Sequence, residues 1–170
     1  PQGENQGRWT SYLKDEHSYT CSDVALDGEV GKEGCLLHVS GNFRATTLGG
    51  NFILDLSDPA NPRKRGEIHY QKGESNYHGH GVCADGRYEY HGNYLVDYQN
   101  PDKLKVVSEL KYPLPKDTVR QLAVNGNFLY TTVTVAGRQN YETGNPGVAV
   151  IDVSDRTSPK FLSQTIVPRG

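Results

Sequence analysis

The chain of 170 residues contains no methionine, one tryptophan and three cysteines, and no N-x-[ST] glycosylation sequon occurs in it. No apolar run approaches the roughly 20 residues that a membrane-spanning helix needs. The 18 basic and 20 acidic residues give a net charge of −2, so no basic surface for nucleic acid is indicated. These absences predict a protein without a membrane span and without a nucleic-acid partner. Because the chain starts at Pro1 and lacks methionine, we expect a processed product or a piece of a longer protein.

Motifs of several enzyme classes are also missing. The sequence has no G-x-S-x-G elbow, no H-E-x-x-H zinc motif, no phosphate-binding Walker loop and no C-x-x-C-H haem attachment site. Their absence favours a non-enzymatic protein.

A segment of similar sequence occurs three times: DLSDPANPRKRGEI from Asp55, DYQNPDKLKVVSEL from Asp97 and DVSDRTSPKFLSQT from Asp152. Each copy follows an apolar, strand-like run. A repeat of roughly 40–45 residues made of short strands is typical of a β-propeller blade. The 19 glycines, nine prolines and 11 tyrosines suit an all-β chain rich in turns.

The strands of each repeat can be placed from its turns. Gly41, Gly86 and Gly126 each lie in a short polar stretch between two β-rich runs, which predicts a tight hairpin after the first strand. The apolar runs ending at Asp55, Asp97 and Asp152 are the third strands, and a polar fourth strand follows each. Four strands per repeat make one blade.

The turn after each third strand shares its chemistry. Its closing Asp is followed three residues later by Asp58, Asn100 or Asp155, and then by proline. Short Asx side chains accept hydrogen bonds from the backbone two residues further on, and proline cannot extend a ladder of strands. The sequence therefore predicts a reversal of the chain here. Calcium binding to these Asp and Asn oxygens is the alternative.

These segments resemble the LVIVD-repeat family, which is named for the apolar strand and its closing Asp. The runs ILDLSDPANPRKRGEI and AVIDVSDRTSPKFLSQT are the better matches and YLVDYQNPDKLKVVSEL is the weaker one, so that the resemblance covers residues 33–168. It implies a β-propeller, usually in exported bacterial or archaeal proteins, hence a secreted, periplasmic or cell-surface location. It implies no catalytic residue.

We therefore expect an all-β, incomplete β-propeller of three four-stranded blades over residues 33–72, 73–115 and 116–170. Residues 1–32 form an N-terminal extension that could add a strand. Propellers close with 4–8 blades, and an open stack leaves two apolar flanks exposed. A protein partner, self-association or further sequence of the same chain must then cover those flanks.

The segment NYHGHGVCADG is the densest group of metal-binding side chains. Counting back six residues from the hairpin glycines gives Cys35, His80 and Arg120, and counting back eight gives Glu33 and His78. All five are expected on one face of the innermost strands, which line the channel. His78, His80 and Cys35 could bind copper or zinc. Histidines that bond backbone carbonyls are the structural alternative. A metal-dependent oxidoreductase with this site is the second function that the sequence allows.

Glu33 and Arg120 are also candidates for binding a polar ligand. The third repeat is longer by residues 136–147, and insertions in repeats often lie on the binding face, so Tyr141 within that segment is a further candidate. Cys21 and Cys35 flank a glycine-rich stretch, which leaves open a disulfide in an oxidising compartment or reduced thiols. The function that we expect is a non-enzymatic module for protein assembly or ligand binding.

Overall fold

The computed structural model describes residues 19–43, 48–69, 81–91, 94–110, 122–135 and 145–166. These residues form three four-stranded antiparallel sheets and no helix, and so no helix that could cross a membrane. The strands are β1 (Tyr19–Asp27), β2 (Leu36–Phe43), β3 (Leu48–Asp55) and β4 (Arg63–His69) in the first sheet, β5 (Val82–Ala84), β6 (Tyr88–His91), β7 (Tyr94–Asp97) and β8 (Lys105–Glu109) in the second, and β9 (Leu122–Asn125), β10 (Phe128–Val135), β11 (Asn145–Asp152) and β12 (Lys160–Ile166) in the third.

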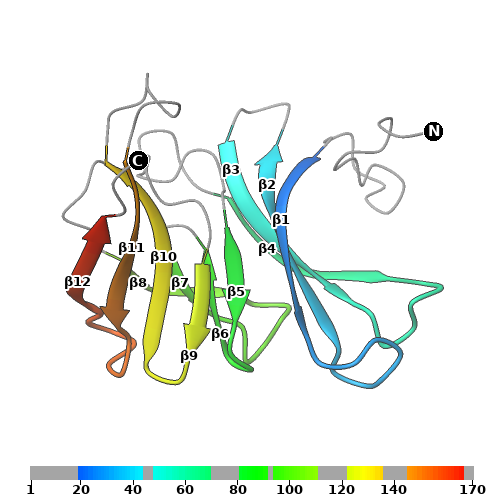
Figure 1. Cartoon of the computed structure of the whole chain (residues 1–170). Coiled ribbons are helices and arrows are strands. Elements are labelled where there is room, and N and C mark those ends of the chain that lie inside the picture. Colours follow the sequence, from blue (N-terminus) through cyan, green and yellow to red (C-terminus); the bar gives the residue numbers. More distant parts are fainter. Residues whose placement is uncertain are drawn as a thin grey trace.

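Each sheet is a meander in which sequential strands are neighbours, and the three sheets lie side by side as blades 1, 2 and 3 (Figure 1). The first strand of blade 2, β5, contacts the first strands β1 and β9 of the other two blades, so these three are the innermost strands. The described strands form an open arc and not a closed ring. The predicted all-β, incomplete propeller of three blades is thus confirmed.

The hairpin glycines of the second and third blades lie where the sequence predicts them. Gly86 and Gly126 connect the first two strands of their blades with φ values of 88° and 58°. The assignment of Gly41 to this turn is wrong: Gly41 lies inside β2 and pairs with Gly50 of β3 and Cys21 of β1. The first strand of blade 1 is β1, which comes from the segment before residue 33, and the longer connection Gly28–Cys35 takes the place of the short hairpin.

The predicted turn chemistry is confirmed in all three blades. The Asp that closes each third strand accepts a hydrogen bond from the backbone two residues on, and the Asx three residues after it does the same. These bonds join Asp55 to Ser57, Asp58 to Ala60, Asp97 to Gln99, Asn100 to Asp102, Asp152 to Ser154 and Asp155 to Thr157, at 2.8–3.1 Å. Two consecutive Asx turns therefore reverse the chain each time.

Blade 1 packs one face against blade 2, and blade 2 packs the corresponding face against blade 3. We call this the leading face of each blade. Cross-strand pairs identify the residues that lie on it. It consists of Leu36, His38, Asn51, Ile53 and Gly66 in blade 1, of Tyr88, Tyr90, Leu95 and Ser108 in blade 2, and of Phe128, Tyr130, Val148, Val150 and Ser163 in blade 3. The opposite, trailing face of each blade alternates with it along every strand.

The apolar core lies between the blades. Tyr90 and Leu95 on the leading face of blade 2 pack against Leu129, Ile151 and Val153 of blade 3, and all five are buried. Between blades 1 and 2 a smaller cluster joins Leu36 and Ile53 to Tyr98. Full burial of such side chains contributes roughly 1.5–3 kcal/mol each, so contacts between blades stabilise the arc.

Candidate functional site

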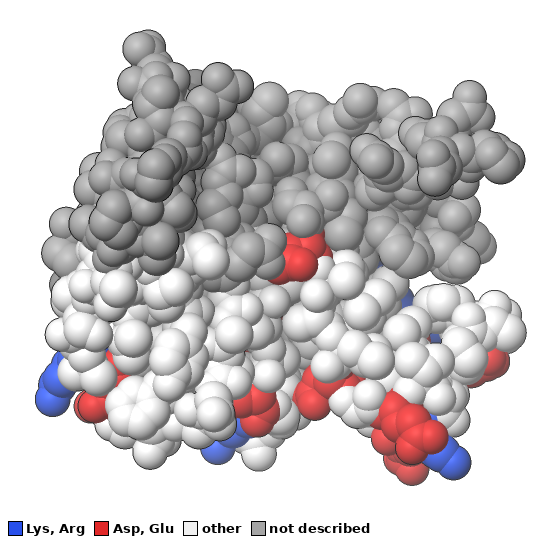
Figure 2. All heavy atoms as spheres, viewed as in Figure 1, with Lys and Arg blue, Asp and Glu red and all other residues white. Residues whose placement is uncertain are grey.

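A cleft of about 550 Å³ opens between blades 1 and 2, at the end of the blades where the Asx turns lie. Figure 2 shows Lys, Arg, Asp and Glu side chains along the lower edge of the molecule, with a further acidic group near the centre of the view. The residues that line the cleft come from both blades: Asp27, Glu33, Gly34, Leu36, Asp55, Ser57, Arg63 and Arg65 from blade 1, and Gly86, Tyr98, Gln99 and Pro101 from blade 2.

One wall of the cleft is the glycine-rich connection Gly28–Cys35, which is longer than the corresponding hairpins of blades 2 and 3. It is held on the first Asx turn by two backbone hydrogen bonds, from Gly31 to Leu56 at 3.0 Å and from Leu56 to Cys35 at 2.9 Å. Gly34 has a φ of 81°, a conformation that favours glycine. The lengthened loop therefore creates a wall that the other blades do not have.

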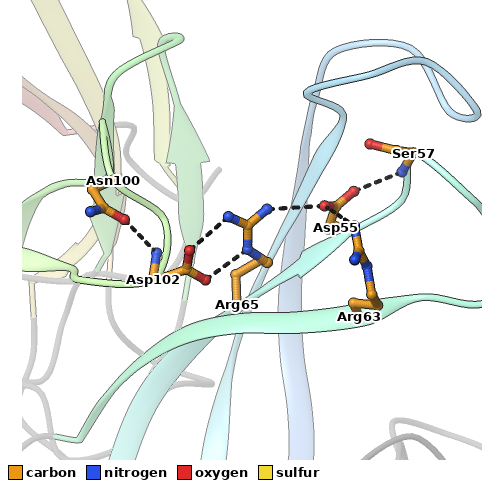
Figure 3. A network of polar contacts seen from close by, with 6 residues as sticks. All are labelled: Asp55, Ser57, Arg63, Arg65, Asn100 and Asp102. Atoms are coloured by element: carbon orange, nitrogen blue, oxygen red, sulfur yellow. Dashed lines mark hydrogen bonds and ion pairs between the residues drawn. The ribbon is translucent and has the colours of Figure 1, made fainter.

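A polar network forms the outer end of the cleft (Figure 3). Arg65 of β4 donates two parallel hydrogen bonds of 2.7 Å to Asp102 in the turn of blade 2 and a third of 3.0 Å to Asp55. Arg63 contacts Asp55 at 3.3 Å, and its side chain stays 74% exposed. The network ties blade 1 to blade 2 and leaves most of the Arg63 guanidinium available to a ligand.

The hydrogen bonds from Ser57, together with Arg65 and Arg63, outweigh burial and lower the pKa of Asp55 to about 2 from its usual 3.8. A folded-state pKa below the unfolded one stabilises the fold at pH above about 4, and this contribution disappears as the pH falls towards 2. We expect Asp55→Asn to reduce the free energy of unfolding at pH 7 by about 2 kcal/mol, and the difference from wild type to shrink between pH 4 and pH 2. Urea unfolding at a series of pH values measures it.

The control for that experiment is Asp152→Asn, at the same position of blade 3. Asp152 also bonds the backbone of its turn, at Ser154, but among the described residues no ion pair to an arginine or lysine joins it. Its substitution should cost less. Equal losses from the two variants, or a loss in Asp55→Asn that does not change with pH, would contradict the assignment.

The inner end of the cleft is acidic. Asp27, at the end of β1, accepts a 2.6 Å hydrogen bond from the hydroxyl of Tyr98, and Glu33 lies exposed on the glycine-rich loop. Burial and then the carboxylates of Asp27, Asp55 and Glu29 raise the pKa of the neighbouring Cys35 thiol. Cys35 is 1% exposed, so its thiol is shielded from solvent.

Beneath the cleft, a fully buried polar cluster joins the same two blades. His38 Nδ1 lies 2.7 Å from a carboxylate oxygen of Glu89, and the other oxygen accepts a hydrogen bond from Asn51. The ring of Tyr98 packs edge-on against His38 with centroids 4.5 Å apart. This cluster was not predicted from the sequence. Its only signal in the sequence is a polar residue inside an otherwise apolar strand, as in the alternation of YEYH.

The structure places the predicted site residues as follows. Glu33 lines the cleft, although on a loop and not on a channel-lining strand as predicted. Cys35 directly precedes β2, so its placement on an innermost strand is wrong, because β1 takes that position. His78, His80, Arg120 and Tyr141 lie outside the described residues, and the metal site that includes His78 and His80 stays a prediction.

The two cysteine hypotheses have a clear outcome. Cys21 pairs with Gly41, whereas Cys35 adjoins Leu36, which pairs with Asp27 at the other end of β1. The two cysteines are therefore six residues, or roughly 20 Å, apart along the strands, far beyond the reach of a disulfide. Cys35 is a free thiol, and the disulfide hypothesis is wrong.

For calcium and other ions, the described part of the chain offers no group of three or more His, Cys, Asp or Glu side chains arranged to hold a metal. In the turns that suggested calcium, the carboxylates of Asp55 and Asp58 accept hydrogen bonds from the backbone instead. The hydrogen bonds of the Asx turns therefore explain the presence of both aspartates.

The LVIVD repeat model matches residues 118–165, which contain the four strands of blade 3 except Ile166, the last residue of β12. The resemblance read from the third copy is therefore confirmed over that range. Among curated proteins, none matches the chain.

Proposed function

We propose that this chain, which carries an LVIVD repeat and folds as three propeller blades, acts as an assembly module whose leading face on blade 3 binds the trailing face of another blade of the same type. The supporting observation is the exposure of that face. Phe128, Tyr130 and Val148 are 42%, 37% and 41% exposed.

The corresponding positions of the other blades are covered. Leu36 of blade 1 corresponds to Phe128 and is 8% exposed, and Tyr90 of blade 2 corresponds to Tyr130 and is fully buried. Blades 1 and 2 thus bury this face against the next blade, and blade 3 presents it to solvent. A contiguous exposed apolar face of this kind marks an interaction site.

A polar contact also joins the leading face of blade 2 to blade 3. Ser108 on the leading face of blade 2 donates a 2.8 Å hydrogen bond to the backbone oxygen of Arg156, four residues after Asp152 in the Asx turn of blade 3. Ser163 occupies the position of Ser108 in blade 3 and is exposed. In the proposed assembly its hydroxyl donates to the equivalent turn carbonyl of the incoming blade.

The assembly role is non-enzymatic, and an exported location, which the resemblance implies, is part of the same proposal. The support for a non-enzymatic role is that the residues shared by the three copies are used for folding: the Asx side chains bond their own turns, and the apolar strands pack between blades.

In a preparation of this chain alone, the available blades are those of other copies, so we expect association that depends on concentration. Val148→Lys places an ammonium group on the apolar face and should weaken association at least roughly tenfold, which is about 1.4 kcal/mol, while changing monomer stability by less than about 0.5 kcal/mol. Sedimentation equilibrium or light scattering measures the mass.

The matched control is Val106→Lys, because Val106 is 43% exposed and lies on β8 outside the leading face of blade 3. It should associate as the wild type does. If the wild type stays at 18.8 kDa over the whole concentration range, or if both lysine variants weaken association equally, the proposed role of this face is wrong.

A further inference from the structure

The floor of the cleft between blades 1 and 2 is one row of residues across the first sheet. Asp27 pairs with Leu36, Leu36 with Asp55, and Asp55 with Arg63, so all four side chains lie on the same face at the same height. The row starts with a carboxylate on the innermost strand and ends with a guanidinium on the outermost one. The cleft is therefore charged with opposite sign at its two ends.

The charges in the middle of the row are already neutralised within the protein. Asp55 is 8% exposed and is held by Arg63 and Arg65, and Arg65 in turn binds Asp102 with both carboxylate oxygens engaged. These groups shape the cleft and do not present free charge to a ligand.

The charges at the two ends remain available. Among the described residues Asp27 has a single hydrogen bond, which the neutral hydroxyl of Tyr98 donates to one oxygen, and Glu33 has no ion pair. At the other end Arg63 is 74% exposed and uses one nitrogen on Asp55. The raised pKa of Cys35, caused by burial and then by Asp27 and its neighbours, is consistent with a negative potential at the inner end.

We propose that this cleft binds a small zwitterionic ligand, with a cationic amine or guanidinium against Asp27 and Glu33 and a carboxylate against Arg63. Three strand spacings separate the ends of the row by roughly 14 Å. These are backbone spacings, and the Arg63 guanidinium reaches back to Asp55, two strand spacings or roughly 10 Å from Asp27. The gap between the two charged ends is therefore shorter than the row and suits a ligand of the size of a dibasic amino acid. The blade 2 wall, with Gln99 exposed and Tyr98 buried, offers hydrogen bonds and no exposed aromatic platform for stacking a sugar.

Three related compounds test both ends. L-arginine carries both charges, agmatine lacks the carboxylate and L-citrulline lacks the cationic guanidinium. We expect L-arginine to bind the 170-residue chain most tightly, and each of the other two to bind roughly tenfold more weakly, because one charged contact is lost. Isothermal calorimetry gives the affinities, and NMR shift changes locate the site.

Two variants assign the ends. Glu33→Gln should weaken L-arginine and agmatine by roughly fivefold or more, whereas Arg63→Gln should weaken L-arginine and leave agmatine unchanged. The controls are Glu29→Gln, from the same loop, and Lys103→Gln, from the turn of blade 2, since both residues are exposed and neither lines the cleft. The controls should bind as the wild type does.

Absence of binding for all three compounds would overturn the proposal, as would equal binding of L-arginine and L-citrulline or an equal effect of the site and control variants. The proposed site does not involve the leading face of blade 3. Val148→Lys should therefore bind L-arginine normally, and failure of this proposal leaves the assembly function to its own test.

Discussion

Replacing Glu89 with alanine is expected to lower the free energy of unfolding by about 3–5 kcal/mol, since it removes the hydrogen-bond partner of two buried polar side chains. Glu89 is fully buried between blades 1 and 2, where its carboxylate binds His38 at 2.7 Å and accepts a hydrogen bond from Asn51. The alanine variant leaves both of those buried side chains without their partner. Urea unfolding at pH 7 measures the loss.

Two further variants test whether the loss comes from the buried hydrogen bonds of Glu89 or from removing a glutamate as such. Glu89→Gln keeps the shape and the oxygen that accepts from Asn51, so it should cost clearly less than alanine. Glu109→Ala removes the same residue type from β8 of the same blade, where the residue is exposed, and should change stability by less than about 0.5 kcal/mol. If Glu89→Ala costs no more than Glu109→Ala, the cluster does not hold the blades together.

The cluster also shows what the sequence could not predict. Glu89 and His38 are adjacent only because blade 2 stacks on blade 1, and no local pattern encodes that contact. A polar residue in a strand normally indicates a solvent-facing side chain. In blade 2 both faces of the sheet are covered by neighbouring blades, so the alternation of polar and apolar residues does not indicate which side chains face solvent. Glu89 and His91 are buried there.

The turns were predictable for the opposite reason. An Asx side chain that bonds the backbone two residues on needs no other part of the chain, so Asp55, Asp97 and Asp152 could be assigned from three similar segments. The apolar third strands followed from the same repeats. This local chemistry carried the prediction of three four-stranded blades.

The first copy was misaligned because its local signal was misleading. The motif Ser-Gly-Asn around Gly41 has the composition of a hairpin, but the strand continues through it and pairs on both sides. Pairing with β1 and β3 outweighs the turn preference of the three residues. Because of this misalignment, Cys35 and Glu33 were both assigned to a channel-lining strand. Of the two, only Glu33 lines a cleft.

Gly66 provides the second large effect, and it tests the stacking of the blades directly. A methyl group built on Gly66 would overlap with the carbonyl oxygen of Pro101 and lie 2.9 Å from Cγ of Leu104, both in blade 2. The backbone at Pro101 and the packed side chain of Leu104 can move away from the added methyl group only if the two blades separate. We expect Gly66→Ala to lower the free energy of unfolding by about 3 kcal/mol, the upper part of the range for overpacked interiors.

The comparison with Gly126→Ala makes this result specific. Gly126 has a φ of 58° and no atom within 4 Å of an added methyl group, so its alanine variant suffers backbone strain alone, at a cost of roughly 1 kcal/mol. Ser108 occupies the position of Gly66 in blade 2 and has room for a side chain that bonds the facing turn. The blade 1 interface is therefore closer than the blade 2 interface at this point, and Gly66→Ala must cost more than Gly126→Ala in urea unfolding if the two blades pack as described.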